Sequence, residues 1–216
     1  MNLILLGPPG VGKGTYGEIL SRRHSIPKIS TGDIFREAIK SGSELGNQVK
    51  DILDKGILVP DEITNEIVKQ RLNKVDCDKG FILDGYPRTI GQAEALANIK
   101  EIDVVFNFVA RDDVIIDRIS GRRTCKRCGA IYHIKNIPPK IAGYCDKCSG
   151  ELYQRADQKP EVVKQRLIEY KEKTEPLIKY YTEKKLLVNI DANINISDPD
   201  FHVIEDCEKI LEKIKK

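Results

Sequence analysis

The stretch GPPGVGKGT, residues Gly7 to Thr15, decides the fold of this chain. It follows the apolar run 3–6 and nearly matches the phosphate-binding pattern G-x-x-x-x-G-K-[ST], with both glycines and Lys13 in place. A glycine-rich turn from a strand to a helix points backbone N–H groups into one space, and the helix N-terminus adds partial positive charge. The stretch therefore predicts a phosphate site in which Lys13 reaches the outer phosphates.

Position 14 is glycine, where most loops of this pattern place a hydroxyl on magnesium. Gly14 offers no side-chain ligand, and the hydroxyl of Thr15 comes one residue late. We therefore hypothesise that magnesium is held here mainly by the nucleotide and by water, which suits this ion. Asp84 ends a later apolar strand, the usual place for an acid that holds magnesium or its waters. The competing interpretation is that Asp84 is only a turn residue before Gly85.

The chain has the composition of an ordinary globular protein, with 216 residues, of which 40% are hydrophobic and 32% charged. Its net charge of +3 gives no ground for a nucleic-acid partner, because that interpretation needs a concentrated basic patch. No segment approaches the ~18 consecutive apolar residues of a membrane span, and we expect no signal peptide. We expect a cytoplasmic protein without membrane contact, whose six cysteines bind metal or stay as free thiols.

Short apolar runs alternate with segments of helical periodicity along the sequence. Strands are expected at 2–6, 27–31, 81–85, 103–109 and 186–191. Helices are expected at 13–23, from the capping residue Ser30 through Ile39, from Asp61 onward, at 92–99, at 112–120, at 160–181 with a bend at Pro176, and at 203–214. This alternation predicts an α/β fold with a five-stranded parallel sheet flanked by helices on both faces.

Two stretches depart from the alternation. Residues 121–158 hold four cysteines, two consecutive prolines and little helical periodicity, so we interpret them as an insertion on the core. Residues 30–59 form a second, smaller helical insertion. The expected core domain then consists of residues 1–29, 60–120 and 159–216.

The cysteines of the larger insertion have the spacing of a metal site. Cys125 and Cys128 form one C-x-x-C pair and Cys145 and Cys148 form another, with 16 residues between the pairs. This spacing predicts a four-cysteine zinc site, which is structural because four protein ligands leave no open position. Redox dithiols or four ordinary buried cysteines would not explain paired C-x-x-C turns in a segment that lacks its own core. Iron and cobalt also accept four thiolates.

Arginines recur where this fold is expected to place its loops. Phosphoryl transfer needs positive charge around a spread-out transition state and little covalent chemistry. Arg88 follows the end of a predicted strand, where ligands bind in open α/β sheets. Arg122 and Arg155 bracket the insertion 121–158, so a hinged insertion would bring both over the site and exclude water. The sequence offers no Ser-His-Asp set, and direct transfer between two bound substrates is the simpler interpretation.

The motifs together are specific enough to indicate a family. They are Gly7–Thr15, Ser30-Thr31-Gly32-Asp33, Asp84-Gly85-Tyr86-Pro87-Arg88, Gly121-Arg122-Arg123 and Arg155-Ala156-Asp157, in this order along the chain. The chain resembles the adenylate kinases over nearly its full length. Loops of that family normally read G-K-G-T, which accounts for Gly14.

The resemblance implies transfer from MgATP to AMP giving two ADP, with 30–59 as the AMP-binding domain and 121–158 as a lid that holds zinc in some bacterial members. It implies a P-loop nucleoside monophosphate kinase fold, a monomer, and a role in adenine nucleotide homeostasis. The ATP-binding residues implied are Gly10, Val11, Gly12, Lys13, Gly14, Thr15, Arg118, Arg122, Ile131, Tyr132 and Ile194. The AMP-binding residues implied are Thr31, Arg36, Ile57, Leu58, Val59, Gly85, Tyr86, Pro87, Arg88, Gln92, Arg155 and Arg166. Lys13, Asp84, Arg88, Arg122, Arg155 and Arg166 are the expected catalytic set.

One implied residue has an independent chemical reason, and four positions depart from the family. The side-chain amide of Gln92 can both donate to and accept from an adenine edge. Tyr16 and Gly17 stand where the family often has Gln and a small residue, and Tyr86 replaces a frequent Phe. Gln158 stands where a second Asp often follows Asp157, which leaves the role of that second acid in lid closure open.

Three other functions remain open at this point. The nearest is a kinase for another nucleoside monophosphate, UMP or CMP, although Thr31 and Gln92 favour AMP by family analogy. A zinc-ribbon nucleic-acid module on a phosphate-loop ATPase is a second, but the insertion has few aromatic side chains that could stack on bases. The third is a nucleotide-binding regulator without turnover.

Overall fold

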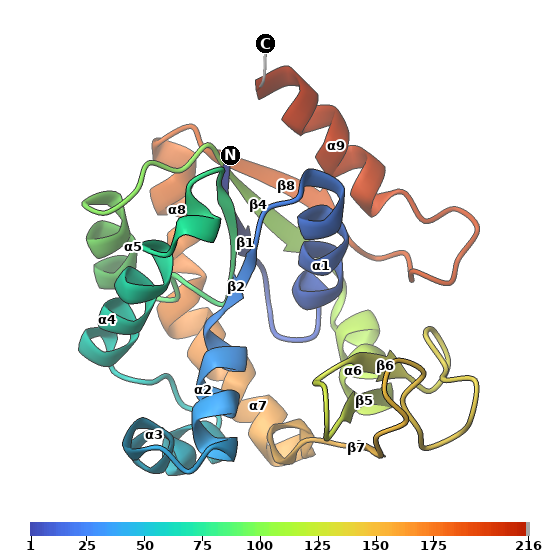
Figure 1. Ribbon diagram of the computed structural model, residues 1–216. Coiled ribbons are helices and arrows are strands. Elements are labelled where there is room, and N and C mark those ends of the chain that lie inside the picture. Colours follow the sequence, from blue (N-terminus) through green and yellow to red (C-terminus); the bar gives the residue numbers. More distant parts are fainter. Residues whose placement is uncertain (215–216) are drawn as a thin grey trace.

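The structure is a computed structural model that describes residues 1–214 (Figure 1). Its centre is a parallel sheet with the strand order β2-β3-β1-β4-β8. The strands are β1 (Asn2–Leu6), β2 (Lys28–Ser30), β3 (Phe81–Asp84), β4 (Val104–Val109) and β8 (Leu187–Asp191). All lie within the segments expected from the sequence, and the five-stranded parallel sheet is confirmed.

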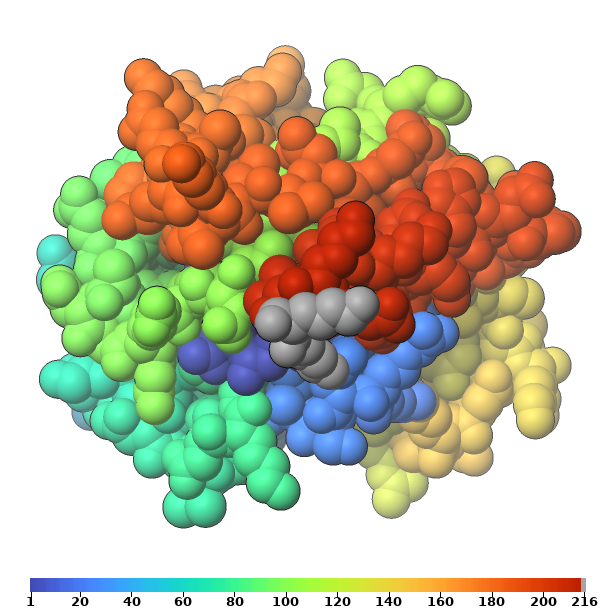
Figure 2. Space-filling view, turned by 90° about the horizontal axis from the view of Figure 1, so that it is seen from above, coloured from blue at the N-terminus to red at the C-terminus, as the bar shows by residue number. Residues whose placement is uncertain are grey.

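Helices cover both faces of this sheet and divide the core in two (Figure 1). On one face Leu20 of α1 (Lys13–His24) and Cys207 of α9 (Val203–Ile214) pack with Leu3, Leu5 and Phe106. The other face is covered by α4 (Asp61–Leu72), α5 (Ile90–Ala97) and α8 (Pro176–Glu183). Figure 2, seen from the end of the molecule where the N-terminus lies, shows α9 in red beside α1 in blue. Strands buried on both faces explain why their sequences are continuously apolar.

Two residues that depart from the family pattern are explained by packing on this sheet. The ring of Tyr16 lies 5.0 Å from the ring of Phe108 and 6.0 Å from that of Phe201, so it fills the core beneath α9. A Cβ atom at Gly17 would stand 2.8 Å from Leu5 Cδ1, closer than real Cβ contacts allow. The glycine lets α1 lie close against β1.

The helical insertion consists of two helices with their own small core. They are α2 (Thr31–Lys40) and α3 (Glu44–Asp54), and Ser30 and Ser43 cap them by accepting from the N–H groups of Asp33 and Gly46. Phe35, Val49 and Val59 form the buried centre of this unit.

The larger insertion contains secondary structure that the sequence did not predict. After α6 (Asp112–Gly121), strands β5 (Arg122–Cys125), β6 (Ile131–His133) and β7 (Leu152–Tyr153) form an antiparallel sheet with β5 in the middle. These strands are too short to show a clear alternation of apolar and polar residues.

The prediction of one long helix at 160–181, bent at Pro176, needs correction. The structure has α7 (Pro160–Glu169), a π-helical turn over Tyr170–Thr174, and α8 beginning at Pro176. In the wide turn, Glu175 N–H donates to Tyr170 O over five residues at 2.8 Å. Pro176 has no N–H to continue the helical ladder, so the chain enters α8 through this wider turn.

Within residues 1–214, no helix combines the length and the apolar composition that crossing a membrane requires.

At Gly46, the close contact between α2 and α3 and the helix propensity of glycine predict opposite effects of a substitution by alanine. Helix propensity alone says that Gly46→Ala stabilises the protein by about 1 kcal/mol. A Cβ at this position, however, would lie 2.2 Å from Ala38 O and 2.4 Å from Ala38 C. We expect the overpacking to dominate and to lower the free energy of unfolding by about 1–3 kcal/mol, measured by denaturant titration. An unchanged or raised midpoint would show that the two helices separate without cost.

Candidate functional site

The loop from β1 to α1 forms a cradle of backbone N–H groups. Gly7, Gly10 and Gly12 have φ values of 129°, 88° and 117°. At Gly10 the space is also closed, because a Cβ there would lie 2.4 Å from Ile119 Cγ1. Helix α1 begins at Lys13 without a side-chain cap, so donors of its first turn stay available to an anion.

Lys13 lies half-buried at the base of this cradle. Its Nζ donates to Gly7 O at 2.6 Å and to Pro8 O at 2.9 Å. The pKa of Lys13 is lowered to about 7, chiefly by desolvation; the Asp84 carboxylate opposes the shift, and Arg88, Arg166 and Arg122 add to it. A bound polyanion would reverse this effect, because negative charge favours the charged form of the amine.

The position without a hydroxyl, Gly14, lies beside Asp84. A Cβ at Gly14 would stand 3.5 Å from Asp84 Oδ2. Asp84 ends β3 and is paired in register with Leu5 of β1 and Ser30 of β2. The carboxylate therefore supplies oxygen ligands close to where a loop hydroxyl would otherwise stand. Such an oxygen suits magnesium or the water bound to it.

Arginines from separate elements converge on the same cleft. The pKa of Arg88 is lowered to about 10 by desolvation and then by Arg166, and that of Arg122 to about 9 by desolvation and then by Arg155. Burial and then Arg36 also lower the pKa of Arg155. Positive groups that depress each other's pKa in a buried place form a site for a highly charged anion.

Arg122 gives the clearest indication that this cleft suits an anion. Among the described residues, its Nε and Nη2 atoms are buried without a hydrogen-bond partner. A buried, unpaired guanidinium is costly, and phosphate oxygens are the groups that its planar fork matches best.

Asp157 and Gln158 organise Arg155, near the end of the larger insertion, and Arg166, which follows it. Asp157 Oδ2 accepts from Arg166 Nη1 at 2.8 Å, while Arg155 Nε donates to Thr124 Oγ1 at 2.9 Å. Burial would raise the pKa of Asp157, but Arg166, Arg122 and Arg155 outweigh it and hold the pKa below its usual range. Gln158 Oε1 accepts from the N–H of Arg155 at 3.1 Å, so this residue caps the turn without adding a second negative charge.

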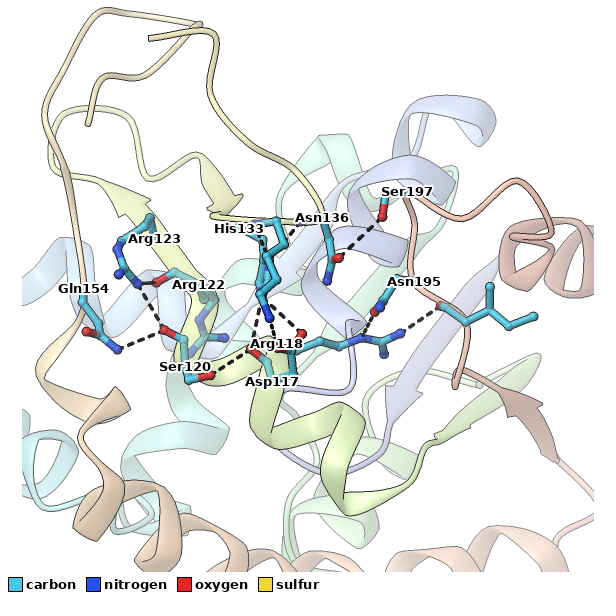
Figure 3. A network of polar contacts seen from close by, with 12 residues as sticks. Asp117, Arg118, Ser120, Arg122, Arg123, His133, Asn136, Gln154, Asn195 and Ser197 are labelled. Carbon is cyan, nitrogen blue, oxygen red and sulfur yellow. Dashed lines mark hydrogen bonds and ion pairs between the residues drawn. The ribbon is translucent and has the colours of Figure 1, made fainter. Parts of the chain in front are cut away.

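Arg118 connects α6 to the phosphate loop and to the segment after β8, and Figure 3 shows its contact with Asn195 of that segment. It donates to Val11 O at 2.7 Å, to Asn195 Oδ1 at 3.0 Å and to Ile194 O at 2.8 Å. The carbonyl of Ile194 is thus bonded to Arg118.

His133 joins the larger insertion to the end of α6 (Figure 3). Its Nε2 lies 3.1 Å from Asp117 O, and its Nδ1 accepts from the N–H groups of Lys135 and Asn136. Two backbone donors at Nδ1 fix the neutral tautomer with the proton on Nε2.

These groups line a cleft of about 230 Å³ at the carboxyl edge of the sheet. The expected residues that line it are Gly10, Gly12, Lys13, Gly14, Thr15, Arg36, Leu58, Asp84, Gly85, Pro87, Arg88, Arg118, Arg122, Ile131, Tyr132, Arg155 and Arg166. A small side hollow adjoins it, and Thr31, Ile57, Val59 and Gln92 line this hollow together with Leu58, Gly85 and Arg88.

A few expected residues line neither space. Val11 and Tyr86 are 0% exposed, and Ile194 contributes its carbonyl to Arg118 as described.

Gln92 lines the side hollow, but both of its amide atoms already have protein partners: Nε2 donates to Asp61 and Oε1 accepts from the N–H of Arg88. The ligands that all these residues would contact remain predictions.

Sequence reasoning missed several residues that line the cleft. They are His133, Asn136, Ile137, Glu169, Tyr170, Thr174, Asn195 and Ile196. The position of His133 directly after Tyr132 was a usable signal. Glu169, Tyr170 and Thr174 lie in or beside the π-helical turn, which has no sequence pattern of its own.

The four cysteines of the larger insertion meet in space. Their Sγ atoms all lie within 4.8 Å of one another, with 3.5 Å between Cys125 and Cys148 and 3.6 Å between Cys128 and Cys145. A tetrahedral zinc with Zn–S bonds of about 2.3 Å places its sulfurs roughly 3.8 Å apart, so the cluster fits such an ion.

Two similar turns prepare these thiols for a cation. Gly129 N–H donates to Cys125 O, and Ser149 N–H donates to Cys145 O, with left-handed φ values of 74° and 57° at Gly129 and Ser149. Although burial would raise it, the pKa of Cys145 is lowered to about 6 by the Tyr132 hydroxyl and by backbone N–H groups. Thiolate is the form that binds metal.

Comparison with known proteins gives one consistent result. The family model described as adenylate kinase matches residues 5–186. A curated protein of Archaeoglobus fulgidus named adenylate kinase is 52% identical, with 100% of each chain covered. The adenylate kinase of Caldicellulosiruptor bescii is 55% identical over 95% of this chain and 98% of its own. That of Treponema denticola is 54% identical over 89% of this chain and 92% of its own.

Proposed function

Since the chain belongs to the adenylate kinase family, whose members are ATP:AMP phosphotransferases, we propose that it moves the terminal phosphoryl group of MgATP directly and in line onto AMP, giving two ADP. The two guanidinium atoms of Arg122 that are buried without a hydrogen-bond partner, beside Lys13 and the other cleft arginines, carry this proposal. In the cell this reaction serves adenine nucleotide homeostasis.

The arrangement of the cleft supports direct transfer. The phosphate loop would hold the donor, the side hollow would hold the acceptor base, and Gly85 and Arg88 line both spaces. The phosphoryl group in flight is a spread-out anion, and cations fixed around it lower its energy without forming covalent bonds. Lys13, Arg88, Arg122, Arg155 and Arg166 would supply these cations from the loop, the β3 end, both margins of the larger insertion and α7.

Asp84 would hold magnesium, directly or through water, together with the nucleotide phosphates. Magnesium bound there would neutralise charge on the donor phosphates.

The domains are proposed to move about this cleft. In our proposal residues 121–158 are a lid and residues 30–59 close over AMP, while 1–29, 60–120 and 159–216 form the core, of which 215 and 216 lie outside the described residues. Arg122 opens β5 and Arg155 directly follows the β7 region, so lid closure moves both ends of the arginine clamp together. Closure also excludes water, which would otherwise take the phosphoryl group.

The four cysteines would hold a structural zinc. The lid has only a small buried cluster of its own, Cys125, Tyr132 and Cys145, and a segment of that size needs a further staple. Zinc binding to finger peptides contributes about 10–16 kcal/mol, as much as the whole stability of a typical domain.

The first experiment measures ADP formation from MgATP with AMP, UMP, CMP or GMP, and without an acceptor. We expect fast turnover with AMP only, as measured by a coupled spectrophotometric assay. Preference for UMP or CMP would keep the mechanism and overturn the substrate. Phosphate release without acceptor would indicate an ATPase instead.

The pKa of Lys13 predicts proton uptake when MgATP binds. At about pH 8 most of the amine is neutral in the free protein, since its pKa is about 7, whereas the bound phosphates favour the charged form. Calorimetric titration in two buffers of different ionisation enthalpy should show uptake of close to one proton at about pH 8. At about pH 6 Lys13 is already charged, and uptake should nearly vanish. Equal uptake at both pH values would contradict this role.

Metal removal should disorder the lid and leave the core folded. We expect elemental analysis to find about one zinc per chain, and a chelator to open residues 121–158 to trypsin while 1–120 stays protected. Cys128→Ser should do the same, whereas Cys207→Ala, which removes a core cysteine outside the cluster, should keep the zinc. A lid that stays protected after complete metal loss would rule out a structural ion.

A further inference from the structure

Asp61, the first residue of α4, holds Gln92 at two points. Its Oδ1 accepts from Gln92 Nε2 at 2.7 Å, and its Oδ2 accepts from Thr89 Oγ1 at 2.6 Å. Thr89 is the N-cap of α5, and the same hydroxyl oxygen accepts from the backbone N–H of Gln92 at 3.1 Å. One carboxylate therefore fixes the side chain of Gln92 directly and the start of its helix indirectly.

Two partners that cannot exchange roles determine which way the Gln92 amide faces. The backbone N–H of Arg88 donates to Gln92 Oε1 at 2.7 Å, and a backbone N–H can only donate. The Asp61 carboxylate can only accept. Turning the amide over would put donor against donor at Arg88 and acceptor against acceptor at Asp61. Gln92 is only 2% exposed, so water could not relieve either contact.

A hydrogen bond also fixes the backbone at Gln92. The hydroxyl of Tyr86 lies 2.8 Å from Asn65 Oδ1 and 3.1 Å from Gln92 O. It joins α4 to α5 at this point, which gives the tyrosine a role that the phenylalanine frequent in the family lacks.

A fixed amide can distinguish purines by the order of donor and acceptor on their edges. After the two bonds described, Gln92 has one N–H and one oxygen lone pair left for a ligand in the side hollow that it lines. Adenine offers a ring-nitrogen acceptor beside an amino donor, which one orientation of an amide matches. A 6-oxopurine offers a ring N–H beside a carbonyl, which only the opposite orientation matches.

We propose that Asp61 is a positioning residue that sets acceptor specificity: by locking the Gln92 amide, it selects adenine over 6-oxopurine nucleotides. This inference rests on the proposed function, because it requires that AMP is the acceptor and that its base lies beside Gln92. Asp61 touches no substrate in this proposal and acts only through Gln92.

The test compares Asp61→Asn with two control variants, using MgATP as donor and AMP or IMP as acceptor. An asparagine side chain can donate as well as accept, so one of the two contacts that oppose turning disappears. We expect the ratio of kcat/KM for AMP to that for IMP to fall roughly ten- to a hundredfold. The change should come from a higher KM for AMP and a lower KM for IMP, with kcat for AMP nearly retained.

The two controls distinguish a change in the orientation of the Gln92 amide from a general loss of stability around it. Glu62→Gln removes the same charge from the same helix turn, but Glu62 is exposed and makes no side-chain hydrogen bond among the described residues. It should leave the ratio unchanged. Thr89→Val removes the helix cap and the Oδ2 contact while both contacts to the amide remain, so it should lower the unfolding midpoint and keep the ratio.

The outcomes are distinguishable. Wild-type protein that prefers AMP, together with an Asp61→Asn variant that keeps the same AMP-to-IMP ratio, would overturn the inference alone. A ratio lost equally in Thr89→Val would also overturn it, because the effect would then be structural. Wild-type protein that does not use AMP would overturn the proposed function itself.

Discussion

Several cations held together in one partly buried cleft are the constraint on which this structure depends. Desolvation is the largest cause of the lowered pKa of Lys13, Arg88 and Arg122, and neighbouring arginines add to each shift. They come from segments far apart in the sequence, so the folding of the whole core is needed to hold them in one place. A bound polyphosphate reverses the cost. In the region where we propose that its ligands bind, the free protein is therefore electrostatically unfavourable, and the sheet and the helices around the cleft supply the stability that this region lacks.

The sequence predicted those parts of the fold that depend on local patterns. The five apolar runs became the five parallel strands, the phosphate loop took the expected turn, and the two C-x-x-C pairs met. The elements that the sequence did not predict are short or irregular. Strand β7 has only 2 residues, and the π-helical turn at Tyr170 replaces the simple bend expected at Pro176. Neither has a periodicity that a sequence could show. Elements can be predicted where buried apolar residues recur with a regular period along the chain. They cannot be predicted where a single residue changes the direction of the backbone.

The candidate site also contains some residues that the sequence marks and others that it does not. Lys13, Asp84 and Arg88 were found because motifs and strand ends mark them. Asp61 was seen only as the start of a helix, since its contacts to Thr89 and Gln92 span 28 and 31 residues and leave no signature in either segment. The resemblance implied an ATP-binding role for Arg118, but its contact to Val11 spans 107 residues and leaves no signature in the sequence either. Groups that hold a site in shape are paired by the tertiary fold, and one sequence by itself does not contain that pairing.

The order of the strands also governs when the protein can fold during its synthesis. The first strand made, β1, is the central one, and it pairs in register with Phe81 of β3 on one side and Val104 of β4 on the other. It must wait for both partners to leave the ribosome, and β4 in turn waits for β8, which begins at Leu187. Such non-local pairing slows folding and keeps apolar strands exposed while the chain grows. The five-stranded sheet of the growing chain therefore stays incomplete until β8 has been translated.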